Sequence, residues 1–374
     1  MASRIFTLEA LAAKHGDCLL LHWGGTREPR LLVIDGGPGG VYRAFLRKRL
    51  EALRASRGSP LAIDLLMVSH VDDDHINGVL DLTEEIEEDE RAGREPHYRI
   101  DGLWFNSFDD VLGNAASLVR ATARAPVSPE HRDAAATIAS VGQGRSLRRR
   151  AETLGMIVNG GDLLVTDGWI WDYGDGLTLQ VLGPRQQRID EFREAWDTEL
   201  VRRGWDVRPD LAEVAAFVDR SPWNLASTVV VAKVGRRRIL LTGDARGDDI
   251  LDGLREGGLL TGATVRFDVL KVPHHGSDRN VSTEFFRTVE ADHYVISGNG
   301  EHHNPDTTTL EMIVAARGDA RYTVHCTYRR GIKGLGERLD AFLAALPAER
   351  RERFVFRDES ELGLRLDLGA RLPD

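Results

Sequence analysis

Cysteine is almost absent from this chain of 374 residues, which contains only Cys18 and Cys326. Both cysteines lie in apolar stretches. We therefore interpret them as small buried side chains in a reducing compartment, in preference to a catalytic or metal-binding role. Hydrophobic residues make up 42% of the chain, so a sizeable core can form without a disulfide framework.

Long apolar runs are absent as well. No stretch reaches the roughly 18 consecutive apolar residues of a membrane span. The first residues, 1–9, lack the basic region followed by a long apolar stretch that marks a signal peptide. We therefore expect a cytoplasmic protein that does not associate with a membrane.

The chain also lacks an excess of positive charge. It has 49 Lys and Arg residues against 59 Asp and Glu residues, and its formal net charge is −10. This balance argues against a broad basic surface that grips a nucleic-acid backbone. Two basic runs, 145–150 and 236–238, could form a local patch, but we interpret each as a solvated face.

What the chain does have is many short apolar segments separated by turn signals. These segments predict strands at 5–11, 18–23, 31–34, 63–68, 100–105, 177–182, 227–234, 238–241, 267–272 and 293–297. The segments between them predict helices at 41–56, 77–85 and 187–203. Two β-rich halves with helices outside favour an α/β fold, an αββα sandwich.

We expect residues 1–374 to form a single domain. The charged segment 84–96 is typical of an exposed loop or a helix extension. Residues 106–160 have mostly helical character, and we expect 86–160 to be a helical insertion that borders the cleft.

Residues able to bind metal are most concentrated at 69–75, Ser-His-Val-Asp-Asp-Asp-His, directly after an apolar predicted strand. His70 and Asp72 alternate in an extended segment, so both can face one metal ion. Asp74 and His75 lie where the chain turns into a helix and can reach a second. Imidazole and carboxylate together suit Zn²⁺, Mn²⁺ or iron better than Ca²⁺.

Three other predicted strands also end in polar groups, at the position where α/β folds bind ligands. Asp244 follows one strand and could bridge two cations. His274 and His275 follow the next strand. Because adjacent side chains point in different directions, one could bind metal while the other meets substrate. His302 and His303 follow the last strand and could contact substrate or form a polar capping loop.

Together these motifs resemble the metallo-β-lactamase superfamily, and most of all the soluble hydrolase domain of ComEC-type competence proteins. The resemblance depends on Ser-His-x-Asp-x-Asp-His at 69–75, Leu-Thr-Gly-Asp at 241–244 and Lys-Val-Pro-His-His-Gly-Ser at 271–277. Three weaker elements at 14–21, 33–37 and 224–230 fit the same pattern. The resemblance covers about residues 8–85 and 160–312, and it implies the metallo-β-lactamase fold.

The resemblance also implies a site for two divalent metal ions, with Zn²⁺ or Mn²⁺ expected. His70 and Asp72 would bind the first ion. Asp74 and His75 would bind the second, and Asp244 would bridge the two.

Further roles follow from the same resemblance. His275 would join the second metal while His274 would bind a phosphate oxygen, or the two would exchange these roles. Asp74 would orient the attacking water and accept its proton. His302 or His303 would stand at the mouth of the site as an acid or a substrate contact.

The chain departs from the superfamily pattern at two points. Asp72 replaces the usual histidine of the first motif, which shifts the expected metal modestly toward Mn²⁺ or Mg²⁺. The usual histidine between this motif and Gly-Asp is missing. Only His97 and His131 lie in that interval, and Asn224 stands near the expected place. We therefore expect the first metal site to be weak, or filled only when substrate is present.

These features predict a metal-dependent hydrolase, with a phosphodiesterase or nuclease favoured. Its substrate would be DNA, RNA or a nucleotide, and a metal-activated water would attack it. A second hypothesis is hydrolysis of another ester, a lactone, a thioester or an amide. A third is a partner-controlled effector subunit that is inactive alone. The charge of −10 counts against a free-standing nonspecific nuclease and favours a small substrate, or a partner protein that delivers nucleic acid.

Overall fold

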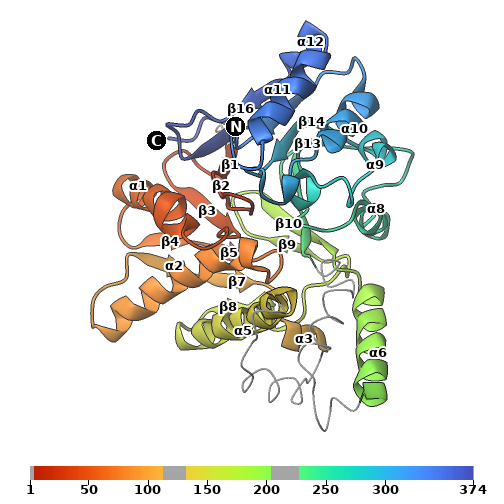
Figure 1. Ribbon diagram of the computed structural model, residues 1–374. Coiled ribbons are helices and arrows are strands. Elements are labelled where there is room, and N and C mark those ends of the chain that lie inside the picture. The colour runs from red at the N-terminus through yellow and green to blue at the C-terminus, as the bar shows by residue number, and fades with distance from the viewer. Residues whose placement is uncertain (1–3, 113–131, 204–226, 374) are drawn as a thin grey trace.

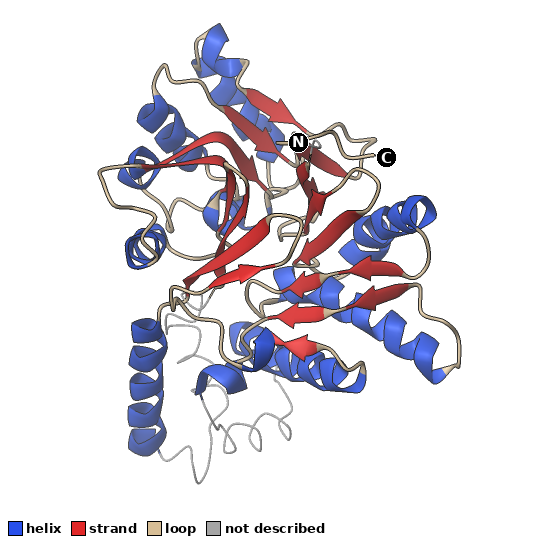
Figure 2. Ribbon diagram, turned by 180° about the vertical axis from the view of Figure 1, so that it is seen from behind, coloured by secondary structure: helices blue, strands red, loops and turns tan. Residues whose placement is uncertain are grey.

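The computed structural model describes residues 4–112, 132–203 and 227–373 of the chain. Two large β-sheets lie face to face, and helices cover their outer faces (Figures 1 and 2). This layer order confirms the predicted αββα sandwich. None of the helices within the described ranges is long and apolar enough to cross a membrane.

The first sheet has seven strands in the order β17-β1-β2-β3-β5-β7-β8. Their bounds are β1 Ile5–Leu11, β2 Leu19–Gly24, β3 Pro29–Ile34, β5 Leu65–Met67, β7 Gly102–Trp104, β8 Ile157–Val158 and β17 Gly363–Asp367. Its outer face carries η1 Tyr42–Leu46, α1 Arg47–Arg57, α2 Asp73–Arg91 and α5 Arg132–Thr153. A separate pair of short parallel strands joins β4 Leu61–Ile63 to β6 Tyr98–Ile100.

The second sheet has eight strands in the order β16-β15-β14-β13-β12-β11-β10-β9. Their bounds are β9 Ile170–Asp172, β10 Leu177–Gly183, β11 Val229–Val234, β12 Arg237–Leu241, β13 Val265–Lys271, β14 Val289–Ile296, β15 Thr323–Cys326 and β16 Phe354–Phe356. Its outer face carries α8 Gly247–Glu256, α9 Thr283–Thr288, α10 Thr307–Arg317 and α11 Leu335–Ala345. The remaining described helices are α3 Phe108–Leu112, η2 Asn159–Gly161, α6 Gln186–Arg203, η4 Pro273–Gly276, η5 Glu301–His303 and α12 Ala348–Arg351.

Apolar residues fill three layers, one between the sheets and one under each set of helices. In β3, Val33 faces the helices while Leu32 faces the other sheet. In β12, Leu240 and Leu241 divide in the same way. Strands that are buried on both faces read as continuous apolar runs, which is why these segments were recognisable in the sequence. Cys18 and Cys326 are buried and free, as predicted.

Several predicted bounds change in the structure. The single strand expected at 63–68 is divided between β4 and β5 at Asp64, whose carboxylate accepts bonds from the side chain of Arg30 and the backbone N–H of Leu31. The helix expected at 77–85 begins at Asp73 and runs to Arg91, so the acidic run is a helix extension.

The range 86–160, expected to be a helical insertion, also contains strands. This range begins with the end of α2, and its strands β7 and β8 belong to the seven-stranded sheet because β7 pairs with β5 and β8 pairs with β7. The described helices between them are α3 and α5. Helix α5 borders the first motif, since the amide of Gln143 donates to the carboxylate of Asp73 at 2.5 Å.

Candidate metal centre

The predicted site residues follow strands that end at one edge of the sandwich. Strands β3, β5 and β7 run parallel in one sheet, and β12 to β15 run parallel in the other. Their carboxyl ends therefore deliver the loops that follow them to a common edge. This arrangement brings together the residues after β5, β12 and β13, although long stretches of sequence separate them.

The first motif is shaped by the start of α2. Asp72 is the N-cap residue and has an extended backbone, but its side chain makes no capping bond. An N-cap aspartate normally accepts a bond from the first helical turn. Here a carboxylate oxygen of Asp72 lies instead 3.5 Å from Nε2 of His70. Asp73 and Asp74 occupy the first helical turn, where the helix dipole favours negative charge.

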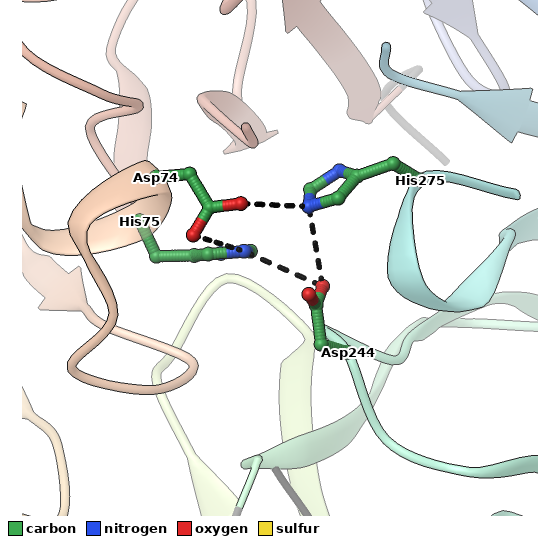
Figure 3. Close-up of side chains that lie close together, drawn as sticks. All are labelled: Asp74, His75, Asp244 and His275. Atoms are coloured by element: carbon green, nitrogen blue, oxygen red, sulfur yellow. Dashed lines mark ion pairs between the residues drawn. The ribbon is translucent and has the colours of Figure 1, made fainter. Parts of the chain in front are cut away.

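Four side chains converge most closely: Asp74, His75, Asp244 and His275 (Figure 3). Nε2 of His75 lies 3.3 Å and Nε2 of His275 lies 3.4 Å from the same Oδ1 atom of Asp244. The carboxylate of Asp74 completes the group, 3.8 Å from Nε2 of His75 and 3.3 Å from Nε2 of His275. These four residues are the set that the resemblance implied for the second metal.

The converging atoms have no other partners among the described residues. Nε2 of His75, Nε2 of His275 and Oδ1 of Asp244 are buried and make no hydrogen bond. Buried polar atoms without a partner cost free energy. A divalent cation between these atoms would satisfy all three, and two imidazoles with two carboxylates are a donor set suited to Zn²⁺ or Mn²⁺. The residues therefore fit a metal ion.

The electrostatics of the cluster also favour a cation. Burial opposes protonation of His75, but the carboxylates of Asp244, Asp74 and Asp35 outweigh it and hold the pKa of His75 well above its usual range. Burial also opposes protonation of His275, but nearby carboxylates, Asp244 above all, raise its pKa well above the usual range. The imidazoles conversely hold the pKa of Asp244 well below its usual range against the effect of burial. A metal ion would take the place of the protons that the two imidazoles hold.

Two buried carboxylates stand behind the two histidines. Oδ2 of Asp35 lies 2.9 Å from Nδ1 of His75 and also accepts a bond from the hydroxyl of Ser69 at 2.7 Å. Oδ1 of Asp17 lies 3.4 Å from Nδ1 of His275, while its other oxygen pairs with Lys271 at 2.6 Å. Carboxylates in this position fix ring orientation and raise ligand basicity.

Sequence reasoning did not assign these carboxylates a role. The signal was available, because Asp35 and Asp17 each lie in a Gly-Asp or Asp-Gly element beside an apolar strand. Asp17, Asp35 and His75 also lie close to one another. Asp17 and Asp35 already have protein partners, so we assign them to orienting the rings.

The first predicted site is more open. Nε2 of His70 lies 3.9 Å from Oδ2 of Asp244, and Asp72 is 35% exposed at its side chain. Nε2 of His274 lies 3.4 Å from the same Oδ2 atom. Burial and the neighbouring His75 oppose protonation of His70, but Asp72 and Asp244 outweigh them and raise its pKa.

At the mouth, His302 and His303 lie in η5 and are exposed. The ring of His302 packs edge-on against the ring of His15, with their centres 5.5 Å apart. Nδ1 of His15 lies 3.3 Å from the carboxylate of Glu301. Sequence reasoning missed His15. Burial lowers the pKa of His15, although the charges of Asp74 and Glu301 oppose this effect.

Of the two histidines in the interval before Asp244, only His97 lies in the described part of the chain. His97 is half-buried and follows α2, and its Nδ1 atom lies 3.8 Å from the carboxylate of Glu85. His131 and Asn224 lie outside the described residues.

The family model described as Metallo-beta-lactamase superfamily matches residues 16–151. The chain has the metallo-β-lactamase fold. The matched segment contains Asp17, Asp35 and the motif at 69–75, but Asp244 and His275 lie beyond it. The two halves of the candidate metal site therefore meet only in the tertiary structure.

Solved structures with low sequence identity also resemble the chain. Zn²⁺-bound PqqB from Methylobacterium extorquens has 11% identity and a TM-score of 0.39, with 94% of this chain and 87% of that chain covered. The metallo-beta-lactamase fold protein YhfI from Bacillus subtilis has 9% identity and a TM-score of 0.41, with 97% and 99% covered. The CmlA beta-hydroxylase E377D mutant has 14% identity and a TM-score of 0.39, with 98% and 54% covered.

No curated protein sequence matches the chain. The relatives named above do not include a ComEC-type competence protein, so that closer relationship stays a prediction. The sequence similarity to the superfamily model is limited to residues 16–151, and the buried His/Asp cluster suited to divalent metal is an observation on this chain itself.

Proposed function

We propose that the chain is a metal-dependent phosphodiesterase with a dinuclear centre, acting on a nucleic acid or a nucleotide. One observation carries the proposal. Asp244 lies between two groups of histidines, with Oδ1 facing His75 and His275 and Oδ2 facing His70 and His274. A carboxylate shared in this way is suited to bridge two cations held side by side.

Divalent cations held by these residues would lower the pKa of a bound water and would neutralise the oxygens of an in-line displacement. The side chains divide the remaining work. Asp74 is partly exposed and stands at the edge of the buried cluster, where it can orient the water and accept its proton. Asp35 fixes the ring orientation of His75, and Asp17 fixes that of His275.

The mouth supplies groups for the leaving group. The ring of His302 packs edge-on against His15, and Glu301 pairs with His15. We assign this cluster to contact with the leaving oxygen, with His15 or His302 as the proton donor. His303, the fourth predicted catalytic residue, lies at the outer rim with its carbonyl accepting a bond from Arg338.

The identity of the metal follows from the donor set. Carboxylates and imidazoles are both present, and the described cluster has no thiolate. We therefore propose Zn²⁺ or Mn²⁺.

A partner protein is favoured by a second observation. Three large apolar side chains are exposed on the edge strands β8 and β9 or just before β9: Ile157 at 66%, Trp169 at 63% and Ile170 at 56%. Neighbouring exposed apolar side chains such as Trp169 and Ile170 favour an interaction site. The basic run at 145–150 offers little to nucleic acid, since Arg148 pairs with Asp110 and Arg150 with Glu84. A subunit whose partner delivers the substrate is therefore the second candidate.

The test is hydrolysis by the purified chain loaded with Mn²⁺ or Zn²⁺. Substrates are bis-p-nitrophenyl phosphate, single-stranded DNA and RNA, beside a panel of lactones, thioesters and amides. The Asp74→Ala/His75→Ala double variant removes half of the buried cluster, and His97→Ala is the matched control. We expect the wild type and the control to cleave a phosphodiester and the double variant to fail.

Equal rates for the wild type and the double variant on every phosphodiester would show the proposal to be wrong. Metal-dependent cleavage confined to the other panel would indicate hydrolysis of another bond. Activity that appears only with a co-purified protein would support the partner-controlled subunit.

A further inference from the structure

The first metal site lacks the histidine that the superfamily normally places between the first motif and Gly-Asp. In the described structure His97 cannot replace it, because it lies beside Glu85 at the far end of α2. A different histidine lies at the open side of the centre. Nε2 of His274 is 3.4 Å from Oδ2 of Asp244, the oxygen that also faces His70.

The backbone of η4 separates the two adjacent histidines. His274 and His275 both have left-handed conformations, with φ of 48° and 55°. Such residues cost free energy and persist where the surrounding structure requires them, often at functional sites. Their rings lie 6.0 Å apart at 79° to each other, and they approach different oxygens of Asp244. The strained turn therefore directs one histidine to each half of the centre.

The ring of His274 is also held in the orientation of a metal ligand. Its Nδ1 atom lies 2.8 Å from Oδ1 of Asn280, and the amide nitrogen of Asn280 donates to the backbone carbonyl of Asp244 at 3.1 Å. An acceptor at Nδ1 places the proton there and leaves Nε2 free. Asn280 thus does for His274 what Asp35 does for His75.

Three pairs of atoms lie at or near the spacing of ligands that share a metal ion. Bonds of about 2.1 Å at tetrahedral angles place neighbouring ligand atoms about 3.4 Å apart. The pairs measured here are 3.5 Å for His70 and Asp72, 3.4 Å for His274 and Asp244, and 3.9 Å for His70 and Asp244.

We propose that His274 is a protein ligand of the first metal, together with His70, Asp72 and Asp244. It takes the place of the absent histidine and does not serve as a contact to substrate phosphate. The inference rests on the dinuclear centre of the proposed function. It gives the first site a second imidazole, so that this site binds metal without substrate.

Metal binding tests the inference without any substrate. Zn²⁺ bound per chain is measured in chelator-buffered solution, and Co²⁺ loading is followed by its visible absorption. The variants are His274→Ala and Asn280→Ala. His97→Ala and His131→Ala test the two histidines of the interval.

We expect two equivalents for the wild type, His97→Ala and His131→Ala. His274→Ala should retain one equivalent and lose the Co²⁺ absorption of the other. The retained equivalent shows that the variant is folded around His75 and His275. Asn280→Ala, which keeps the ring but not its partner, should weaken one site about 10–100-fold. If His274→Ala loses both metals, metal binding by Asn280→Ala tests the inference in its place. Unchanged metal affinity in Asn280→Ala then overturns the inference.

Two equivalents with unchanged affinity in His274→Ala would overturn the inference and leave the proposed function intact. Loss of one equivalent in His131→Ala but not in His274→Ala would assign the ligand to His131. A wild type that binds no more than one metal would overturn both the inference and the dinuclear centre of the proposed function.

Discussion

The Nζ atom of Lys271 lies 2.6 Å from Oδ2 of Asp17, and each side chain is only 1% exposed. The other oxygen of Asp17 faces Nδ1 of His275. Burial would raise the pKa of Asp17, but Lys271 and His275 lower it to about 2. Lys271, Asp17 and His275 are thus buried side chains in successive contact, and His275 is the one that belongs to the candidate metal centre.

Lys271→Met should destabilise the metal-free protein by about 3–5 kcal/mol, because it leaves the Asp17 carboxylate buried without a cation. Urea unfolding measures the loss. The double variant Lys271→Met/Asp17→Asn should recover much of it, since the uncompensated charge is then gone. A single variant as stable as the wild type would contradict this account of the pair.

Asp35→Asn should weaken metal binding about 10–100-fold, because Asp35 orients His75 and accepts bonds from Ser69. Competition with a chelator measures the change. Asp64→Asn is the matched control, because this carboxylate is also largely buried but pairs with Arg30 at the opposite end of β5. Equal affinities in both variants would show that Asp35 does not position the ring.

Gly78→Ala should destabilise the fold by about 1–3 kcal/mol through overpacking. A Cβ atom at Gly78 would lie 2.0 Å from the carbonyl oxygen of Gly36, where α2 packs against the turn after β3. Gly142→Ala in α5 is the control, because a Cβ atom there meets nothing within 4 Å and alanine favours a helix by about 1 kcal/mol. Opposite effects on the thermal midpoint are expected, and equal effects would contradict the close contact.

We expect His325, which is not one of the candidate metal ligands, to make the stability of the fold sensitive to acid. Burial, together with the charge of His293, lowers the pKa of His325 from 6.5 to about 4. Because the folded state has the lower pKa, this contribution is present above pH 6.5 and is lost as the pH falls toward 4. The expected loss is about 2–3 kcal/mol.

Unfolding in urea at pH 7.5 and pH 4.5 measures this loss. His325→Gln should reduce the difference in the free energy of unfolding between the two pH values. His303→Gln, at an exposed histidine, should leave this difference unchanged. The same pH dependence in His325→Gln and the wild type would assign the acid sensitivity to other groups.

Much of the fold was readable from the sequence because it is encoded locally. Apolar runs such as 5–11 and 267–272 predicted strands that the structure contains, with bounds that differ by few residues. The motif at 69–75 is local in the same sense, since a strand end and a helix start place its side chains. Asp64 interrupts one apolar run between β4 and β5. The apolar pattern alone did not predict this break, and a single strand was expected there.

The sequence by itself determined which residue types stand at the strand ends, and the resemblance implied a shared metal for Asp74, His75, Asp244 and either His274 or His275. Only the tertiary structure decided which histidine faces which oxygen of Asp244, and that Asp17, Asp35 and His15 join the site. These relationships join segments as distant as His15 and Glu301. The direction of a ring depends on backbone strain and on hydrogen bonds from other strands, and neither is written in the local pattern of apolar and polar residues.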